Sequence, residues 1–233
     1  MPLSYLDALT VYVVVGTIVG ARLGHVLFYA PDYYFAHPVE ILEIWKGGLA
    51  SHGGAIGILI ALWLFTRKYR KISMLWLLDR LVIPTALGGA FIRIGNLFNS
   101  EIIGKPTDLP WAFVFTRVDS IPRHPSQIYE ALAYLAVFVF LLRYYRRHRR
   151  SLQPGRLFGW FLVLVFSARF LIEFVKEVQE PFEASLPLDM GQILSIPFIA
   201  VGLYFVLRSP KAIPAAATRS SHRGSKTQKE RVR

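Results

Sequence analysis

The chain has 233 residues, 54% of them hydrophobic, and a formal net charge of +12. It contains no cysteine, which excludes disulfides, thiolate nucleophiles and cysteine-based metal sites. Several apolar segments reach the roughly 20 residues needed to cross a bilayer, so the composition predicts an integral membrane protein. The basic residues gather in short loops beside apolar segments and in the tail, which is typical of membrane topology and argues against a nucleic-acid partner.

Six apolar segments predict an all-α, polytopic membrane bundle. They are expected at about 8–29, 52–65, 74–93, 126–143, 157–173 and 190–207. No loop is long enough to build a separate soluble core, so residues 1–208 are expected to form a single transmembrane bundle. The remaining residues, 209–233, are basic and rich in Ser and Ala, which predicts a disordered tail.

Small and polar residues at the segment ends carry local predictions. Gly16, Gly20 and Gly24 are four residues apart and predict close approach of a neighbouring helix. The glycines around His52, in the run 47–54, favour a bend or a close backbone contact. Further along the chain, Asp79 and Arg80 are expected to pair or to reach the interface, and Ser126 is expected to cap the fourth helix.

The third segment ends in a polar stretch that dominates the functional interpretation. Arg93, Asn96 and Asn99 are spaced so that they can share one face of a helix, and Glu101 follows them toward a Gly-Lys-Pro turn. Buried polar groups of this kind in a membrane are costly unless they pair or bind a ligand. Since Arg presents a planar fork that matches phosphate, the stretch favours a phosphate site. A polar seam that only joins two helices is the equal alternative.

Other polar residues allow several interpretations. Arg169 and Glu173 are four residues apart in the fifth segment, so an internal ion pair is expected. A zinc site from His52 and His124 is weakly supported, because no His-x-x-x-His pair exists. No Gly-x-Ser-x-Gly elbow points to a serine hydrolase. Without further context, His52 fits a packing or capping role, and His124 fits a loop-orienting role as well as a functional one.

The distribution of Lys and Arg predicts the orientation. Of the 27 basic residues, 18 lie in 67–75, 143–156 and 208–233, whereas Lys46, Lys105, Arg117 and Arg123 lie in the loops of the other side. By the positive-inside rule, both termini are cytoplasmic and the ends of the helices near His52, Arg93 and Arg169 face outward. The expected pocket opens toward the outer leaflet, where lipid phosphates lie.

Six sequence blocks together resemble the bacterial phosphatidylglycerol–prolipoprotein diacylglyceryl transferase family. The resemblance covers nearly the whole chain, in the family's order. The blocks are Gly20-Ala-Arg-Leu-Gly24, Gly47-Gly-Leu-Ala-Ser-His-Gly-Gly54, Arg93-Ile-Gly-Asn-Leu-Phe-Asn-Ser-Glu-Ile-Ile-Gly104, Arg123-His-Pro-Ser-Gln-Ile-Tyr-Glu130, Arg169-Phe-Leu-Ile-Glu173 and Met190-Gly-Gln-Ile-Leu-Ser-Ile-Pro197.

The resemblance implies an enzyme of the bacterial inner membrane that needs no metal or other cofactor. The diacylglyceryl group of phosphatidylglycerol would pass to the lipobox cysteine thiol of a prolipoprotein, releasing glycerol phosphate. The family's phospholipid-binding arginine falls on Arg93, its second essential arginine on Arg169 and its essential histidine on His52. The resemblance also implies a set of substrate-binding residues that line the pocket with Arg93: Asn96, Asn99, Glu101, Gly104, His124, Gln127, Glu173 and Arg22.

The chain departs from the family's pattern in places. Ile92 stands where the family has Gly, Leu97 where it has Phe, and Val165 where many members have Tyr. The family has seven spans and this chain starts at the second, so we expect the reading frame upstream of Met1 to encode another apolar span with a Tyr-Gly pair. Alternative functions are a transporter or flippase that binds anionic lipid, and an inactive family member. A transporter is disfavoured because the two halves show no internal repeat.

Overall fold

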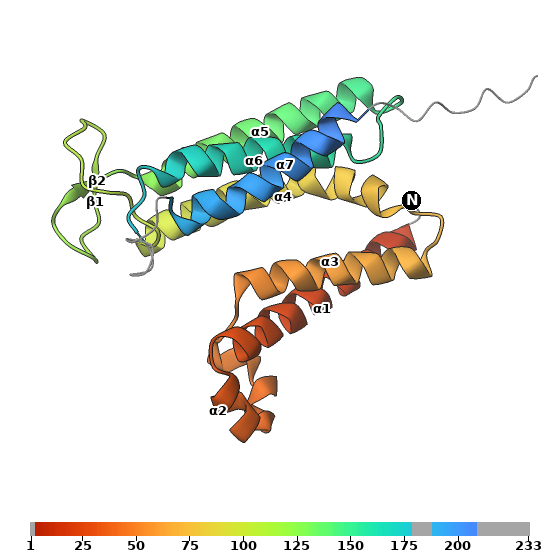
Figure 1. Cartoon of the computed structure of the whole chain (residues 1–233), viewed down its shortest axis with the longest axis horizontal. Helices are drawn as coiled ribbons and strands as arrows, with labels where there is room; N and C mark the ends of the chain where they lie inside the picture. The colour runs from red at the N-terminus through yellow and green to blue at the C-terminus, as the bar shows by residue number, and fades with distance from the viewer. Residues whose placement is uncertain (1–2, 179–187, 209–233) are drawn as a thin grey trace, which may run out of the picture.

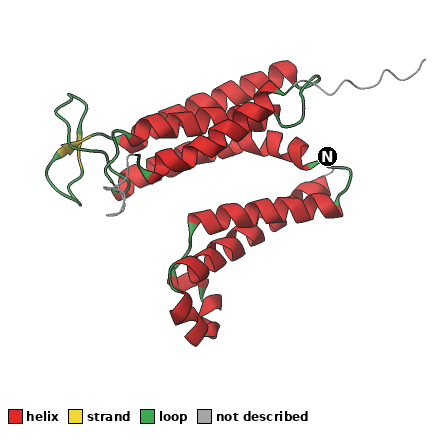
Figure 2. Cartoon of the chain, in the orientation of Figure 1, coloured by secondary structure: helices red, strands yellow, loops and turns green. Residues whose placement is uncertain are grey.

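The computed structural model describes residues 3–178 and 188–208, and this part of the chain is helical nearly throughout (Figure 2). The tail 209–233, for which the sequence predicts disorder, lies outside the described residues, as does 179–187. The elements, in chain order, are α1 (Leu3–Phe28), α2 (Pro31–Ala36), η1 (Pro38–Leu42), η2 (Ile44–Lys46), α3 (Ser51–Lys68), α4 (Met74–Asn99), β1 (Phe113–Val114), β2 (Pro122–Arg123), α5 (Ser126–His148), α6 (Arg156–Glu173) and α7 (Met190–Leu207).

Each of the six predicted apolar segments is a long helix. Among the described residues, four helices are long and apolar enough to cross a membrane: α1, α4, α5 and α7. Both α3 and α6 have 18 residues, and α6 carries Arg156, Arg169 and Glu173 within that length. The protein is therefore a helical membrane protein, as the composition predicts.

The helices pack in two groups (Figure 1). One group is the hairpin of α1 and α3, and the other is the bundle of α4, α5, α6 and α7. The groups meet near the turn that joins α3 to α4, where Leu77 of α4 packs with Leu9, Leu62 and Phe65. From this joint the hairpin and the bundle diverge toward the end that carries β1 and β2. One bundle is expected for residues 1–208; in the structure α1 packs mainly on α3, and α4, α5, α6 and α7 pack on one another.

Glycines set the closeness of α1 and α3. A Cβ on Gly20 would lie 2.7 Å from the Cα of Gly57, and a Cβ on Gly24 would lie 2.7 Å from the Cα of Gly53. Real Cβ atoms do not approach backbone this closely, so the two helices touch through their main chains. The predicted close approach of a helix to the small-residue stripe of α1 is confirmed.

Replacing Gly57 by Ala should therefore separate α1 from α3. The added methyl group meets the backbone of Gly16 and Gly20, which cannot move aside as a flexible side chain could. We expect a lower midpoint of thermal unfolding and faster proteolysis in the 31–50 loop. Gly88→Ala in α4 is the matched control, because nothing lies within 4 Å of its Cβ position. That control should be neutral or slightly stabilising by helix propensity; equal destabilisation of both variants would contradict the glycine-contact argument.

A buried carboxylate fixes α6 against α4. Asp79 is 1% exposed and accepts hydrogen bonds from the backbone N–H groups of Gly155 (2.6 Å) and Phe158 (2.9 Å). It thereby satisfies donors at the start of α6 that have no partner within that helix. The expected Asp79–Arg80 pair is not formed, since the Arg80 guanidinium lies over the Trp76 ring at 3.6 Å. The apolar core of the bundle continues beyond this contact, around Val82, Ala86, Val137, Leu141 and Leu157.

Candidate functional site

A network of buried charges lies where four helix ends meet. The C-terminal end of α4, the first turn of α5, the last turn of α6 and the start of α7 come together at the end of the bundle that carries β1 and β2 (Figure 1). Residues more than seventy positions apart, such as Gly104 and Lys176, are thereby paired. The network is accordingly held by the packing of the whole bundle.

Glu130 is the centre of this network. Its side chain is 0% exposed, and its two oxygens lie 2.7 Å from Nε of Arg93 and 2.9 Å from Nζ of Lys176. Lys176 also lies 3.0 Å from Glu173. Buried charges are costly unless they are paired. In this network cations and anions alternate, so that each of Glu130, Lys176 and Glu173 has a partner of opposite charge. The Glu130 oxygens make no regular hydrogen bond within the described chain, so these ion pairs are what stabilises them there.

From Arg93 the network extends outward along the predicted polar stretch. Nη1 of Arg93 donates to Oδ1 of Asn96 (3.3 Å), and Nδ2 of Asn96 donates to Oε2 of Glu101 (2.6 Å). Nδ2 of Asn99 lies 3.4 Å from the other Glu101 oxygen. The prediction that Arg93, Asn96 and Asn99 share one face of the helix is confirmed, and Glu101, which follows the end of α4, contacts both asparagines. The chain of contacts ends at the exposed Glu101.

The turn after α4 is held in a strained conformation. Ser100 and Ile102 both have φ of 57°, which is unfavourable for a β-branched residue such as Ile102. The hydroxyl of Ser126 donates to the Ile102 carbonyl (2.7 Å), and Nε2 of Gln127 donates to the Glu101 carbonyl (2.6 Å). The expectation that Ser126 caps α5 is wrong, because this hydroxyl serves the turn instead. Gln127 is fully buried and positions Glu101 through the backbone.

Backbone hydrogen bonds bind three segments into one layer beneath the network. Gly104 donates to His124 (3.1 Å), Lys105 donates to Val175 (2.8 Å), and Glu177 donates to Ile103 (3.1 Å). A Cβ on Gly104 would lie 2.5 Å from the His124 Cβ and 2.9 Å from the Val175 carbonyl, so only glycine fits between them. Gly104 is thus a packing residue here. The layer places Lys176, 3% exposed, against Glu130.

Arg123 stabilises this layer through ion pairs and a hydrogen bond. It pairs with Asp119 and Glu177 and donates to the Gly104 carbonyl at 3.3 Å. The hydrogen bond from the Arg123 guanidinium lowers the pKa of the Asp119 carboxyl below its usual value. His124 is half-buried, and its Nδ1 lies 3.3 Å from the Tyr129 hydroxyl. The His124 ring therefore contacts α5, and its backbone pairs with Gly104 and Lys105.

Arg169 lies beside the network without joining it. The expected ion pair with Glu173 is wrong, because Glu173 pairs with Lys176. Within the described residues, Arg169 makes neither a hydrogen bond nor an ion pair. The buried Tyr134 of α5 lies within electrostatic range of both Arg93 and Arg169.

Two predicted site residues lie in the other helix group. Arg22 is 4% exposed and donates to the carbonyls of Glu40, Ile41, Gly47 and Gly48, which ties the 31–50 segment to α1. These contacts use four of the five N–H groups of its guanidinium. His52, exposed at the start of α3, lies 5.5 Å from the Phe28 ring and 5.7 Å from the Tyr29 ring. No contact between described residues joins either of them to the Arg93 network.

Glu130 and Lys176 belong to the network although the sequence patterns assign neither of them a role. Glu130 is one of the few carboxylates inside an apolar segment, and that rarity was an available signal. The other charged residues of the loop that contains Lys176 are acidic. Only the backbone layer of the folded chain directs the Lys176 side chain toward Glu130. No group of three His, Asp or Glu residues in the described ranges is placed to hold a metal ion.

The arrangement is suited to binding a phosphate diester. Arg93 is held at Nε by Glu130 and at Nη1 by Asn96, so its orientation is fixed while 14% of its side chain remains exposed. Arg169 supplies a second guanidinium that has no partner in the described chain. Guanidiniums in an apolar setting attract an anion more strongly than they would in water.

Comparison with known proteins places the chain in a family. The family described as "Prolipoprotein diacylglyceryl transferase" matches residues 2–208. The phosphatidylglycerol–prolipoprotein diacylglyceryl transferase of Tolumonas auensis is 55% identical over 210 residues, covering 90% of this chain and 81% of that protein. Proteins of the same name from Chloroherpeton thalassium and Porphyromonas gingivalis are 50% and 52% identical, covering 90% and 89% of this chain and 78% of each relative. The chain belongs to the prolipoprotein diacylglyceryl transferase family.

Proposed function

We propose that this protein transfers the diacylglyceryl group of phosphatidylglycerol to the lipobox cysteine thiol of prolipoproteins. The sulfur attacks the glycerol carbon that carries the phosphate, a C–S bond forms and the C–O bond to phosphate breaks. The electron pair of that bond leaves with glycerol phosphate, and the thiol proton passes to a base. The observation that carries this proposal is the oriented Arg93, within a chain that matches the family over residues 2–208.

Arg93 and Arg169 are the proposed catalytic arginines. The leaving phosphate gains negative charge as its bond to carbon breaks, so cations held against it stabilise the transition state more than the ground state. Glu130 and Asn96 keep the Arg93 guanidinium in place before substrate arrives. Asn99 and Glu101 extend the polar surface toward the headgroup glycerol, whose hydroxyl groups can donate to a carboxylate.

The other predicted site residues support this site in different ways. Glu173, Gln127, His124 and Gly104 position the network, as their contacts with Lys176, Glu101 and the backbone layer indicate. Arg22 organises the 31–50 segment, and we do not retain it as a substrate ligand. We propose His52 as the base or hydrogen-bond partner of the thiol. This role requires the prolipoprotein cysteine to lie between the ends of the hairpin and the bundle.

The reaction is assayed directly with purified protein, phosphatidylglycerol and a lipobox peptide. A thioether-linked diacylglyceryl peptide and free glycerol phosphate should appear in equal amounts. A lipobox peptide with Ser in place of Cys is the control and should give no product. Movement of labelled phosphatidylglycerol between leaflets without thioether formation would instead identify a flippase, and the absence of both would identify an inactive family member.

We further propose six membrane spans with both termini cytoplasmic, in a bacterial inner membrane. The excess of Lys and Arg in 67–75, 143–156 and 208–233 supports this orientation even after Lys176 is counted on the outer side. A reporter fused after Arg208 should read cytoplasmic, and one in the 105–122 loop should read periplasmic. The opposite pattern would put the Arg93 network at the inner leaflet and would contradict the outward-facing site.

A His52→Asn variant tests the proposed base. Asparagine keeps hydrogen-bonding capacity but cannot take the thiol proton, so folding should be retained while transfer at pH 7 falls by about 10²-fold. The deficit should shrink as the pH approaches about 8.5, where a free thiol ionises without help. Transfer rates from about pH 6 to pH 9 measure this. A deficit that stays constant over that range would favour a packing role against Phe28 and Tyr29.

A further inference from the structure

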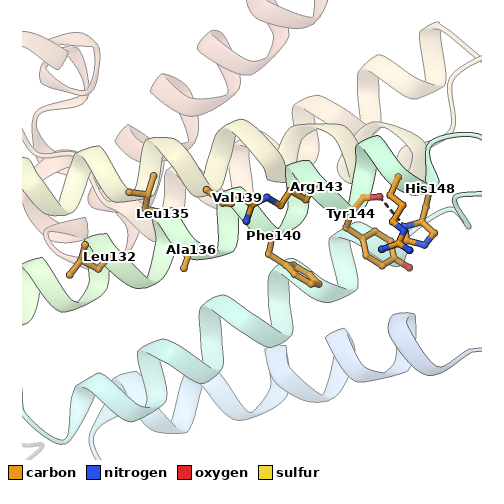
Figure 3. Close-up of a pocket in the computed structure, with 9 residues that line it drawn as sticks. Leu132, Leu135, Ala136, Val139, Phe140, Arg143, Tyr144 and His148 are labelled. Atoms are coloured by element: carbon orange, nitrogen blue, oxygen red, sulfur yellow. Dashed lines mark hydrogen bonds between the residues drawn. The ribbon is translucent and has the colours of Figure 1, made fainter.

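A groove lies on α5, apart from the Arg93 network. It has a volume of about 610 Å³ and runs along one face of this helix (Figure 3). Leu132, Leu135, Ala136, Val139 and Phe140 line its apolar length. At the other end it is lined by Arg143, Tyr144, Arg147 and His148. An apolar trough that ends in cationic and aromatic side chains has the shape and polarity of one lipid molecule.

No carboxylate within residues 3–178 and 188–208 pairs with the cationic end of the groove. Arg143 and Arg147 are exposed, are one helical turn apart and make no ion pair or hydrogen bond with the described residues. The sequence contains no Asp or Glu between Ala131 and Ile172. The His148 ring is stacked on Tyr144 with centroids 4.3 Å apart, and its Nδ1 lies 3.1 Å from the Tyr144 carbonyl. The stacked rings of Tyr144 and His148 line the groove beside the guanidiniums of Arg143 and Arg147.

The length of the groove matches one leaflet. Leu132 and Arg143 are eleven residues apart, which corresponds to about 16 Å along a helix. Half of a hydrocarbon core of about 30 Å is about 15 Å. An acyl chain lying in the groove would therefore reach from the level of Arg143 to about the bilayer midplane. Arg143 and Arg147 would then contact the phosphate of the same molecule.

We propose that this groove binds an anionic phospholipid of the leaflet opposite to the Arg93 network. The two guanidiniums hold the phosphate, and the apolar residues from Leu132 to Phe140 hold one acyl chain. This site goes beyond the proposed transfer reaction and does not take part in it. Its lipid would anchor the inner end of α5, which packs against α4 and α6.

Trp160 of α6 is a natural reporter for this site, because its ring lies 5.6 Å from the Phe140 ring in the groove wall. The full-length protein is titrated in nanodiscs with phosphatidylserine or phosphatidylcholine that carries brominated acyl chains. The Trp160 signal is taken as the difference in quenching between the wild type and Trp160→Phe. Phosphatidylserine should quench at lower concentration than phosphatidylcholine. Inorganic phosphate at the same concentrations should leave this quenching unchanged, since it lacks the acyl chain.

Matched variants separate the groove from general surface charge. Arg143→Gln with Arg147→Gln should weaken phosphatidylserine binding by about fivefold for each arginine removed. Arg149→Gln with Arg150→Gln removes the same charge outside the groove and should change binding little. Ala136→Phe fills the groove and should abolish the Trp160 quenching, whereas Val201→Phe on α7 should not. Equal quenching by the two lipids would overturn the proposal. An equal loss of phosphatidylserine binding in the Arg143/Arg147 and Arg149/Arg150 double variants would do the same. Competition by inorganic phosphate would identify an ion site instead.

Discussion

Glu130→Gln is expected to be the most damaging single substitution in the described part of the chain. Glutamine keeps the shape of the side chain but removes the charge that lies 2.7 Å from Arg93 and 2.9 Å from Lys176. Removing one partner of a buried ion pair costs about 3–5 kcal/mol, because the remaining charge is left uncompensated. We expect a lower thermal unfolding midpoint and a fall in transfer of about 10²-fold, since Arg93 loses its fixed orientation.

Two further variants distinguish loss of charge balance from loss of the site. Glu43→Gln removes a partly exposed ion pair with Lys46 in the hairpin group and should leave both measurements unchanged. Glu130→Gln combined with Arg93→Met removes both charges of this ion pair, leaves Lys176 paired with Glu173, and should recover part of the lost stability. It should not recover transfer, because the Arg93 guanidinium is absent. Wild-type transfer by Glu130→Gln would show that Glu130 does not position Arg93.

Much of the local structure could be predicted because it depends on near neighbours in the sequence. Arg93 and Asn96 are in contact as expected, since helical spacing places side chains three residues apart together. The close contact of α1 and α3 follows from Gly20 and Gly24, because only glycine lets two backbones touch. In both cases the interaction is set within a few residues or by the size of one side chain.

The interactions that were mispredicted or missed depend on distant segments. Glu173 pairs with Lys176 and not with Arg169, because the backbone layer formed with Gly104 and Val175 turns Lys176 inward. Ser126 donates to the Ile102 carbonyl because the strained turn after α4 brings that carbonyl to α5. Local spacing offers several partners for such side chains. The tertiary fold selects among them, and sequence patterns alone do not contain that choice.

Arg93→Lys should reduce transfer by about 10²-fold while the protein still folds and inserts. The ammonium group can still pair with Glu130, so the buried charge balance is retained. It lacks the planar fork that allows one guanidinium to bind Glu130, Asn96 and a phosphate at the same time. Because the phosphate gains charge in the transition state, kcat should fall more than KM rises. Steady-state transfer to a lipobox peptide measures both parameters.

Arg169→Lys extends this test to the second arginine, and Arg80→Lys is the control. Arg169 has no ion pair with the described residues, so its replacement should lower transfer without lowering the unfolding midpoint. Arg80 stacks on Trp76 near the opposite end of α4, and the same change there should leave transfer unchanged. Near-full activity of Arg93→Lys would reduce Arg93 to a structural partner of Glu130. Because lysine preserves the charge in all three variants, a loss confined to Arg93 and Arg169 assigns the effect to guanidinium geometry on the phosphate.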